Sequence, residues 1–229
     1  MKKLILVIIA LLLPIQAIAR IKVNIPAEIA LEILKKGNNR FIEYKMEHPH
    51  IDVKRREQII NGQRPFAIIL TDSDSRIPPE IIFDQGLGDL FVIRNAGNVI
   101  NEATIGSIEY GVYHLGINLI IVLENQYSAI VGEALKNKVE TPGLESLKSA
   151  MQPAIDKCKE EEKEQENGKP GEYCSYEKVI QTHAKLNVKE LWENKGLSTY
   201  AKRHDLMIIP AFYNVDNGLV TILEIDDED

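Results

Sequence analysis

Two short polar segments carry the residue types that could do chemistry, and each one follows an apolar run. The first segment follows residues 65–70 and the second follows residues 119–123. Together they supply carboxylates, a guanidinium, an amide and a hydroxyl: Asp72, Asp74, Arg76, Glu124, Asn125 and Ser128. Asp72 can accept hydrogen bonds that the Asn125 amide and the Ser128 hydroxyl donate, so we expect these three side chains to form a polar network without an ion. Three carboxylates also suit a hard cation such as Mg²⁺ or Ca²⁺, which is the alternative occupant.

The elements that must position these segments are buried strands separated by helices. Apolar runs at 65–70, 90–93, 119–123 and 206–209 alternate with helix-like stretches, a pattern typical of an α/β fold with a mainly parallel sheet and helices on both faces. The run 219–223 follows the turn residues 216–218, which predicts an antiparallel edge strand. Ligands gather beyond the carboxyl ends of such strands, so we expect the two polar segments to meet in one pocket.

Two helices are expected before the first strand. Residues 26–44 place apolar side chains on one helix face, with Gly37 and Asn38 as a candidate interruption. A second, polar helix is expected at 52–61.

Composition indicates one globular domain behind an export signal. The chain has 229 residues, 45% of them hydrophobic and 27% charged. Lys2 and Lys3 precede an apolar run that breaks at Pro14, and small residues follow up to Ala19. We expect a signal peptide at 1–19, a single domain at 20–229 and a periplasmic or secreted location; an uncleaved membrane anchor is the alternative. The net charge of −7 argues against nucleic acid and membrane surfaces as partners.

The chain contains only two cysteines, Cys158 and Cys174, which flank a charged insertion at about 157–175. Export would carry them into an oxidising compartment, so we expect a disulfide between them. Catalytic or metal-binding thiols are the alternative, although no further candidate ligand stands beside either cysteine.

Long stretches of the sequence resemble the β-carbonic anhydrases, zinc enzymes that interconvert carbon dioxide and bicarbonate. The resemblance is strongest from Asp74-Ser75-Arg76 to Arg94-Asn95-Ala96-Gly97-Asn98 and continues through Gly106-Ser107-Ile108-Glu109-Tyr110 and His114-Leu115-Gly116. It extends to residues 37–41 and 211–218, and so covers most of 27–224 except the charged insertion. It implies the family's fold, and a homodimer or higher homo-oligomer.

The same resemblance implies that all three zinc ligands are replaced. Asp72 stands where the family has its first cysteine, Asn125 where it has the histidine and Ser128 where it has the second cysteine. A neutral amide and an un-ionised hydroxyl are poor zinc ligands. Without the metal, nothing lowers the pKa of a bound water from about 15.7 to about 7. We therefore expect neither zinc nor ordinary hydration activity, and no substitute ligand among His48, His50, His114, His183 and His204.

Asp74 and Arg76 correspond to a family pair in which the aspartate accepts a hydrogen bond from zinc-bound water and the arginine orients it. The alternative is a salt bridge that only anchors the loop. The resemblance also implies that the pocket is lined by Ser73, Gln85, Ala96, Gly97, Tyr110 and Glu124. Glu124 stands where the family usually has a glycine, and Gln85 resembles a residue that lines the channel from across a dimer interface.

Three functions follow as hypotheses. The preferred one is a pseudoenzyme related to carbonic anhydrase that binds bicarbonate or another small anion. The alternatives are an active carbonate dehydratase using a metal-free or non-zinc site around Asp74 and Arg76, and a purely structural protein.

Overall fold

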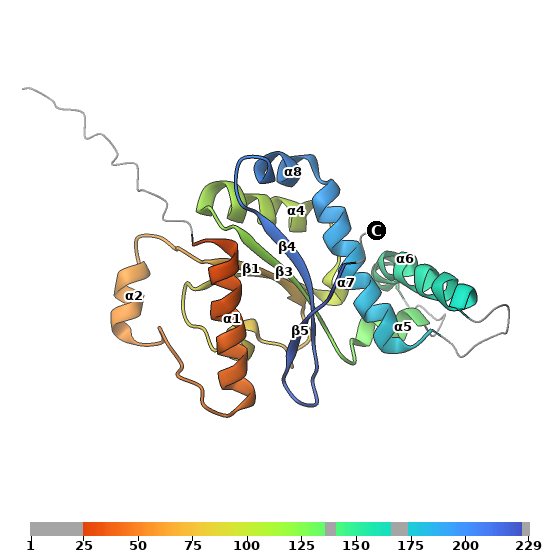
Figure 1. Cartoon of the computed structure of the whole chain (residues 1–229), viewed down its shortest axis with the longest axis horizontal. Helices are drawn as coiled ribbons and strands as arrows, with labels where there is room; N and C mark the ends of the chain where they lie inside the picture. Colours follow the sequence, from red (N-terminus) through yellow and green to blue (C-terminus); the bar gives the residue numbers. More distant parts are fainter. Residues whose placement is uncertain (1–24, 136–140, 166–173, 226–229) are drawn as a thin grey trace, which may run out of the picture.

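The computed structural model describes residues 25–135, 141–165 and 174–225. The predicted signal peptide at 1–19 lies outside the described residues. The centre is a five-stranded sheet of order β2-β1-β3-β4-β5 (Figure 1). Its strands are β1 (Ala67–Asp72), β2 (Leu90–Asn95), β3 (Leu119–Asn125), β4 (Met207–Tyr213) and β5 (Val220–Ile222). All neighbours are parallel except β4 and β5, so the predicted parallel sheet with an antiparallel edge is confirmed.

The central strands are apolar because both of their faces are covered. Every residue of β1 and β3 is buried. In the register, Leu70 of β1 lies beside Ile93 of β2 and Val122 of β3. Since β1 and β3 run side by side, their carboxyl ends reach the same edge of the sheet, where Asp72 and Asn125 stand.

One face of the sheet is covered by α1 (Ala27–Ile42) and α3 (Pro79–Ile82). The expected interruption at Gly37 and Asn38 is wrong, because α1 runs through both residues. Gly37 allows close packing, since a Cβ there would lie only 1.8 Å from the carbonyl oxygen of Phe83. The buried Asn38 amide donates to the carbonyls of Ile82 (3.2 Å) and Gly218 (2.9 Å).

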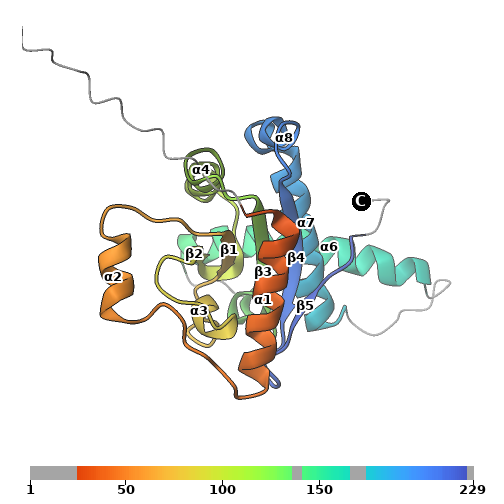
Figure 2. The same ribbon diagram turned by 60° about the vertical axis from the view of Figure 1, so that its left-hand side comes forward.

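The opposite face is covered by α7 (Tyr176–Glu193), α4 (Glu102–Glu109), the π-helical η2 (Tyr110–Leu115) and α8 (Lys195–Ala201). Figure 2 shows α1 and α7 on opposite sides of the sheet, so the prediction of helices on both faces is confirmed. The polar helix α2 (Val53–Ile59) is shorter than the expected 52–61 and buries no residue. Its N-cap is Asp52, whose side chain accepts from the backbone N–H of Arg55.

A third apolar cluster joins α5 (Ala129–Leu135), α6 (Pro142–Gln165) and the start of α7. The predicted disulfide between Cys158 of α6 and Cys174 is present. Cys158 is fully buried, and α6 continues to Gln165, so the charged insertion begins inside a helix. Within the described ranges, no helix has the length and apolar character needed to cross a membrane.

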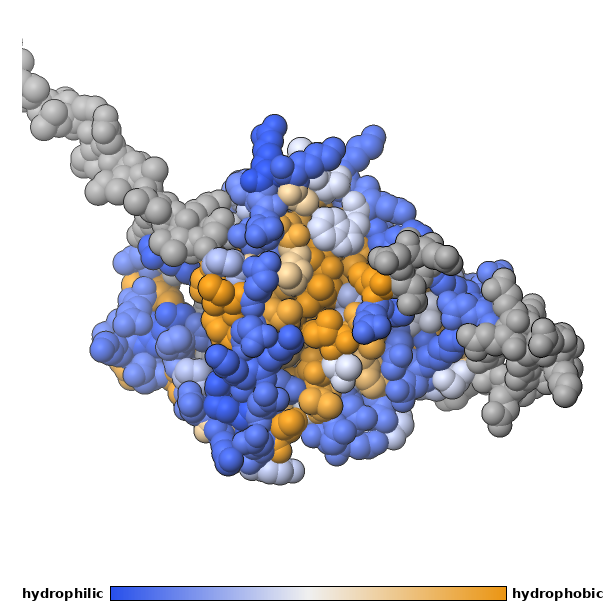
Figure 3. Space-filling view, in the orientation of Figure 1, coloured by the Kyte–Doolittle hydropathy of each residue, from blue (hydrophilic) through white to orange (hydrophobic). Residues whose placement is uncertain are grey.

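An apolar surface remains open between α1 and α7. The edge strand β5 and its neighbour β4 carry the half-buried side chains of Ile209, Val220 and Ile222. Figure 3 shows apolar surface over these strands, with polar surface along the outer sides of both helices. The described residues of one copy therefore cover this face of the sheet only partly.

Candidate functional site

The carboxyl ends of β1, β2 and β3 bring the two predicted polar segments together. Asp72 is the last residue of β1, and it lies in register with Asn95, the last residue of β2. The chain then turns through η1 (Ala96–Asn98). Asn125 ends β3, and Ser128 directly precedes α5. We call the region around the Asp72 carboxylate the Asp72 corner.

Asp72 is a buried carboxylate whose two oxygens both accept hydrogen bonds. Asp72 as a whole is only 4% exposed. Oδ1 accepts from the backbone N–H of Asp74 at 3.0 Å and from the Ser73 hydroxyl at 3.5 Å. Oδ2 accepts from the backbone N–H of Gly97 at 3.0 Å and from the Ser128 hydroxyl at 3.4 Å. Donors from three separate segments therefore hold this carboxylate in place.

Asn125 does not join this arrangement. Its amide nitrogen donates to the backbone carbonyl of Gln126 at 3.0 Å. Its Oδ1 is buried, and within the described part of the chain it has no partner. The network expected among Asp72, Asn125 and Ser128 thus forms only between Asp72 and Ser128.

Asp74 and Arg76 form a bidentate pair at the rim of the corner. Arg76 donates from Nε to Oδ1 at 3.0 Å and from Nη2 to Oδ2 at 2.6 Å. These hydrogen bonds lower the pKa of Asp74 and raise that of Arg76. Arg76 Nη2 also donates to the carbonyl of Tyr127 at 3.0 Å, so the pair links the loop after β1 to the loop after β3.

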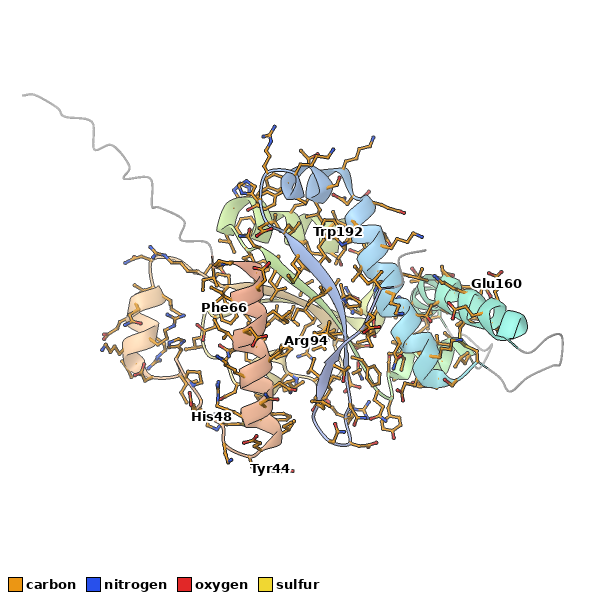
Figure 4. The ribbon with its side chains drawn as sticks, in the orientation of Figure 1. Tyr44, His48, Phe66, Arg94, Glu160 and Trp192 are labelled. Carbon is orange, nitrogen blue, oxygen red and sulfur yellow. A yellow bond between two sulfur atoms is a disulfide. The ribbon has the colours of Figure 1, made fainter. Side chains whose placement is uncertain are left out.

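A second arginine fixes the same loop from β2. Arg94 donates from Nε to the carbonyl of Asp72 at 3.0 Å and from Nη2 to the carbonyl of Asp74 at 2.6 Å. Figure 4 labels Arg94 beside the central strands. Ser73 is exposed, and its backbone N–H donates to the carbonyl of Asn95 at 3.1 Å. Both arginines therefore place positive charge beside Asp72 and Asp74.

Gly97 brings backbone close to the carboxylate. Its φ of 72° lies in the left-handed region that favours glycine. A Cβ at this position would lie 2.9 Å from Cγ2 of Ile130. Both the conformation and the packing thus require glycine where its N–H meets Asp72. Ala96 precedes it in η1 and is half-buried.

Glu124 does not face the Asp72 corner as a third carboxylate. It is buried, and its Oε1 lies 2.8 Å from Nδ1 of His183 on α7. Asn187 lies beside this pair and donates to the carbonyl of Asn98 at 2.9 Å. Among the described residues, no three His, Cys, Asp or Glu side chains come together in a group that could hold a metal.

Two residues assigned to the pocket by resemblance make their recorded contacts elsewhere. Gln85 donates from Nε2 to the carbonyl of Phe83 at 2.9 Å. Tyr110 is 47% exposed, and its ring lies near those of Phe91 and His114. Conversely, the structure adds Tyr176, whose hydroxyl donates to the carbonyl of Ser128. Nothing in the sequence pointed to Tyr176, because it follows the charged insertion.

The donor set of the Asp72 corner does not fit zinc. Tetrahedral zinc sites use thiolate, imidazole or carboxylate ligands. Among the described residues of the corner, the only such groups are the carboxylates of Asp72 and Asp74, and the oxygens of both already accept hydrogen bonds. Asn125 and Ser128 offer an amide and a hydroxyl, which do not ionise at neutral pH. Both cysteines are consumed in the disulfide, and the recorded bond of His183 is to Glu124.

Comparison with known proteins shows which family the chain resembles. The family model described as carbonic anhydrase matches residues 67–220. Carbonic anhydrase 2 of Mycobacterium tuberculosis is 48% identical over 106 residues, which cover 46% of this chain and 51% of that protein. The chain thus spans about half the length of that relative.

Solved structures show the same fold. The β-carbonic anhydrase of the fungal pathogen Aspergillus fumigatus superposes with a TM-score of 0.69 at 21% identity, covering 87% of this chain and 91% of that one. One of two tetrameric β-carbonic anhydrases from Sordaria macrospora gives a TM-score of 0.64 at 22% identity, covering 85% and 97%. The chain therefore belongs to the carbonic anhydrase family, and its fold is that of the β class.

Proposed function

We propose that this chain is a β-class carbonic anhydrase-related protein that holds no zinc at the Asp72 corner, lacks ordinary hydration of carbon dioxide, and binds bicarbonate or another small anion. The observation that carries the proposal is the hydrogen bonding of Asp72. The Asp72 carboxylate stands where the family has a metal ligand, and it already accepts hydrogen bonds from Asp74, Gly97 and Ser128. The protein itself therefore supplies the partners that this buried carboxylate needs, without a metal. Water at this corner therefore keeps its ordinary high pKa.

The anion part of the proposal rests on Arg76 and Arg94. Both side chains are exposed and are fixed by the oxygens of the pocket loop, Arg76 through Asp74 and Arg94 through backbone carbonyls. A guanidinium carries five N–H donors in a planar fork that matches a carboxylate-like ligand. To the described residues, each arginine donates from Nε and Nη2, and the proposed anion would accept hydrogen bonds from Nη1. The two charges also offset the carboxylates of Asp72 and Asp74.

Elemental analysis of the purified mature protein, together with a stopped-flow hydration assay, tests the loss of zinc chemistry. We expect less than about 0.1 zinc per chain and no turnover above background, because the donor set lacks thiolate and imidazole. The triple variant Asp72→Cys, Asn125→His and Ser128→Cys should take up about one zinc per chain if the scaffold is otherwise intact. Stoichiometric zinc bound by Asp72 in the native protein would overturn the proposal.

Bicarbonate binding is tested by titration followed by ¹³C NMR. We expect Arg76→Ala to weaken binding by about tenfold or more, since one charged hydrogen bond is worth about 1.5–3 kcal/mol. Arg56→Ala, which removes an exposed arginine from α2, serves as the matched control and should bind like the wild type. Equal binding by all three proteins would refute the assignment of the anion to this pocket.

The intact geometry of Asp74 and Arg76 favours one second candidate, an active carbonate dehydratase that uses a metal-free or non-zinc site. A hard cation, Mg²⁺ or Ca²⁺, would then have to bind through Asp72 and Asp74, because Glu124 is paired with His183. Turnover that disappears in Asp74→Asn, measured with and without a chelator, would support this candidate over the first.

We also propose that the protein is exported and self-associates. The disulfide between Cys158 and Cys174 suits an oxidising compartment, periplasmic or extracellular. The partly covered apolar surface over β4 and β5, and the tetrameric relatives in Sordaria macrospora, support a homo-oligomer. N-terminal sequencing of the secreted protein should begin at Arg20, and light scattering should give a mass of at least two chains. A chain retaining residues 1–19, or a monomer at micromolar concentration, would contradict the respective part.

A further inference from the structure

Two of the four donors to the Asp72 carboxylate, Gly97 and Ser128, are positioned by one structural unit. This unit, which we call the cap, consists of α5 (Ala129–Leu135), α6 (Pro142–Gln165) and the first turns of α7 (Tyr176–Ile180). Figure 1 shows these helices grouped at one end of the sheet. The cap includes side chains that share the third apolar cluster, among them Val131, Met151 and Val179.

Ser128 is the first point of contact. Its hydroxyl reaches Asp72, while its carbonyl accepts from two parts of the cap. One donor is the backbone N–H of Gly132 in α5, at 3.3 Å, and the other is the hydroxyl of Tyr176 in α7. The orientation of the serine therefore depends on both helices.

Gly97 is the second point of contact. Gly97 packs against the cap: a Cβ at this position would lie 2.9 Å from Cγ2 of Ile130 in α5 and 3.4 Å from Cε of Met151 in α6. The N–H of Gly97 donates to the same oxygen of Asp72 as Ser128 does. Movement of the cap would thus disturb both bonds to Oδ2.

The disulfide fixes the end of the cap that carries Tyr176. Cys174 lies two residues before Tyr176 and is bonded to the buried Cys158 of α6. Ser175 between them caps α7 by accepting from the N–H of Lys178 at 3.2 Å. Lys178 in turn pairs with Glu161 of α6 at 3.1 Å. The start of α7 is therefore held to α6 by a covalent bond and an ion pair.

The Tyr176 hydroxyl stands close enough to Arg76, Asp72 and Asp74 to feel their charges. Burial raises the pKa of Tyr176, so the phenol stays neutral at physiological pH and remains a hydrogen-bond donor.

We infer that Tyr176 is a positioning residue for the Asp72 corner, and that the Cys158–Cys174 disulfide holds Tyr176 in place. The inference deepens the proposed function, because it concerns the same site. A dithiol reductant would break the S–S bond, giving two thiols on the protein and one disulfide on the reductant. Release of α7 from α6 then loosens Ser128 and Gly97 around Asp72.

Amide hydrogen exchange by NMR on the full mature chain tests this inference. Tyr176→Phe removes only the hydroxyl, and we expect exchange at Gly97 and Gly132 to become about fivefold faster, as the loss of one hydrogen bond implies. Reduction of the wild type with dithiothreitol should accelerate the same amides. Ile121, in the middle of β3, should keep its exchange rate and serves as the internal reference.

Tyr113→Phe is the matched control. It removes another tyrosine hydroxyl that donates to a backbone carbonyl, that of Gly196 at 2.7 Å, far along the chain from the cap. It should leave Gly97 and Gly132 unchanged. Unchanged exchange in Tyr176→Phe, or an equal rise at Ile121, would overturn the inference. The exchange measurement needs neither metal nor anion. Zinc in the native protein would therefore contradict the proposed function without affecting the test of Tyr176.

Discussion

Replacement of Asp72 by asparagine separates a carboxylate satisfied by the protein from one that holds a metal. Asparagine keeps one oxygen and turns the other into an NH₂ group. In either orientation, a backbone N–H of Gly97 or Asp74 faces this NH₂ group and loses its acceptor. A buried donor without a partner costs about 1–3 kcal/mol, and the remaining bonds lose their charge assistance. We expect the free energy of unfolding to fall by about 2–4 kcal/mol.

Asp74→Asn provides the matched comparison. It also neutralises one aspartate, but in a more accessible ion pair, since the side chain of Asp74 is 13% exposed and that of its partner Arg76 is 44% exposed. Exposed ion pairs contribute about 0–1 kcal/mol, so we expect a loss of about 1 kcal/mol or less. The difference between the two variants reflects burial and hydrogen bonding, since the change in charge is the same.

Urea unfolding at pH 7 with the disulfide intact is the assay, followed by circular dichroism and by the fluorescence of Trp192. Each protein is measured with and without a chelator. A metal bound only by the native state would stabilise it, so chelation would then lower the stability of the wild type. The reasoning is refuted if Asp72→Asn lies within about 0.5 kcal/mol of the wild type. It is equally refuted if chelation costs the wild type more than about 1 kcal/mol.

Two further predictions concern Asp84, which binds Arg40 near the end of α1, and Gly97 at the Asp72 corner. Burial opposes ionisation of Asp84, but hydrogen bonds from the backbone of Glu47, from Arg40 and from the backbone of His48 outweigh it and lower its pKa below 3.8. The stabilisation from Asp84 is therefore present above pH 3.8 and is lost as the pH falls through the lowered pKa. In Asp84→Asn, the free energy of unfolding should fall less steeply with decreasing pH than in the wild type. An unchanged slope of that free energy against pH would contradict this prediction. Gly97→Ala should cost about 2–4 kcal/mol in urea unfolding, from the left-handed φ and the contact with Ile130, and a loss below about 1 kcal/mol would contradict it.

The sequence pattern predicted the sheet well because the burial of a strand determines its residue composition. Strands covered on both faces are continuous apolar runs, and the runs at 65–70, 90–93, 119–123 and 206–209 became β1 to β4. The strands extend two to four residues further toward their carboxyl ends than these runs. Asp72, Asn95 and Asn125 lie in the strands although they are polar, because ladder hydrogen bonds continue past the apolar core. The interruption expected at Gly37 failed because close packing against Phe83 requires glycine inside that helix.

The candidate site was only partly readable from the sequence. Residue types and order determined that Asp72, Asp74, Arg76 and Ser128 would gather at the carboxyl ends of parallel strands, since register brings those ends together. Only the tertiary structure decided that Glu124 pairs with His183, that Asn125 turns away and that Tyr176 reaches Ser128. The contacts of Glu124 and Tyr176 depend on where α7 packs, and that of Asn125 depends on the direction of its side chain. Contacts between segments 48 and 59 residues apart follow from that packing, which local sequence does not encode.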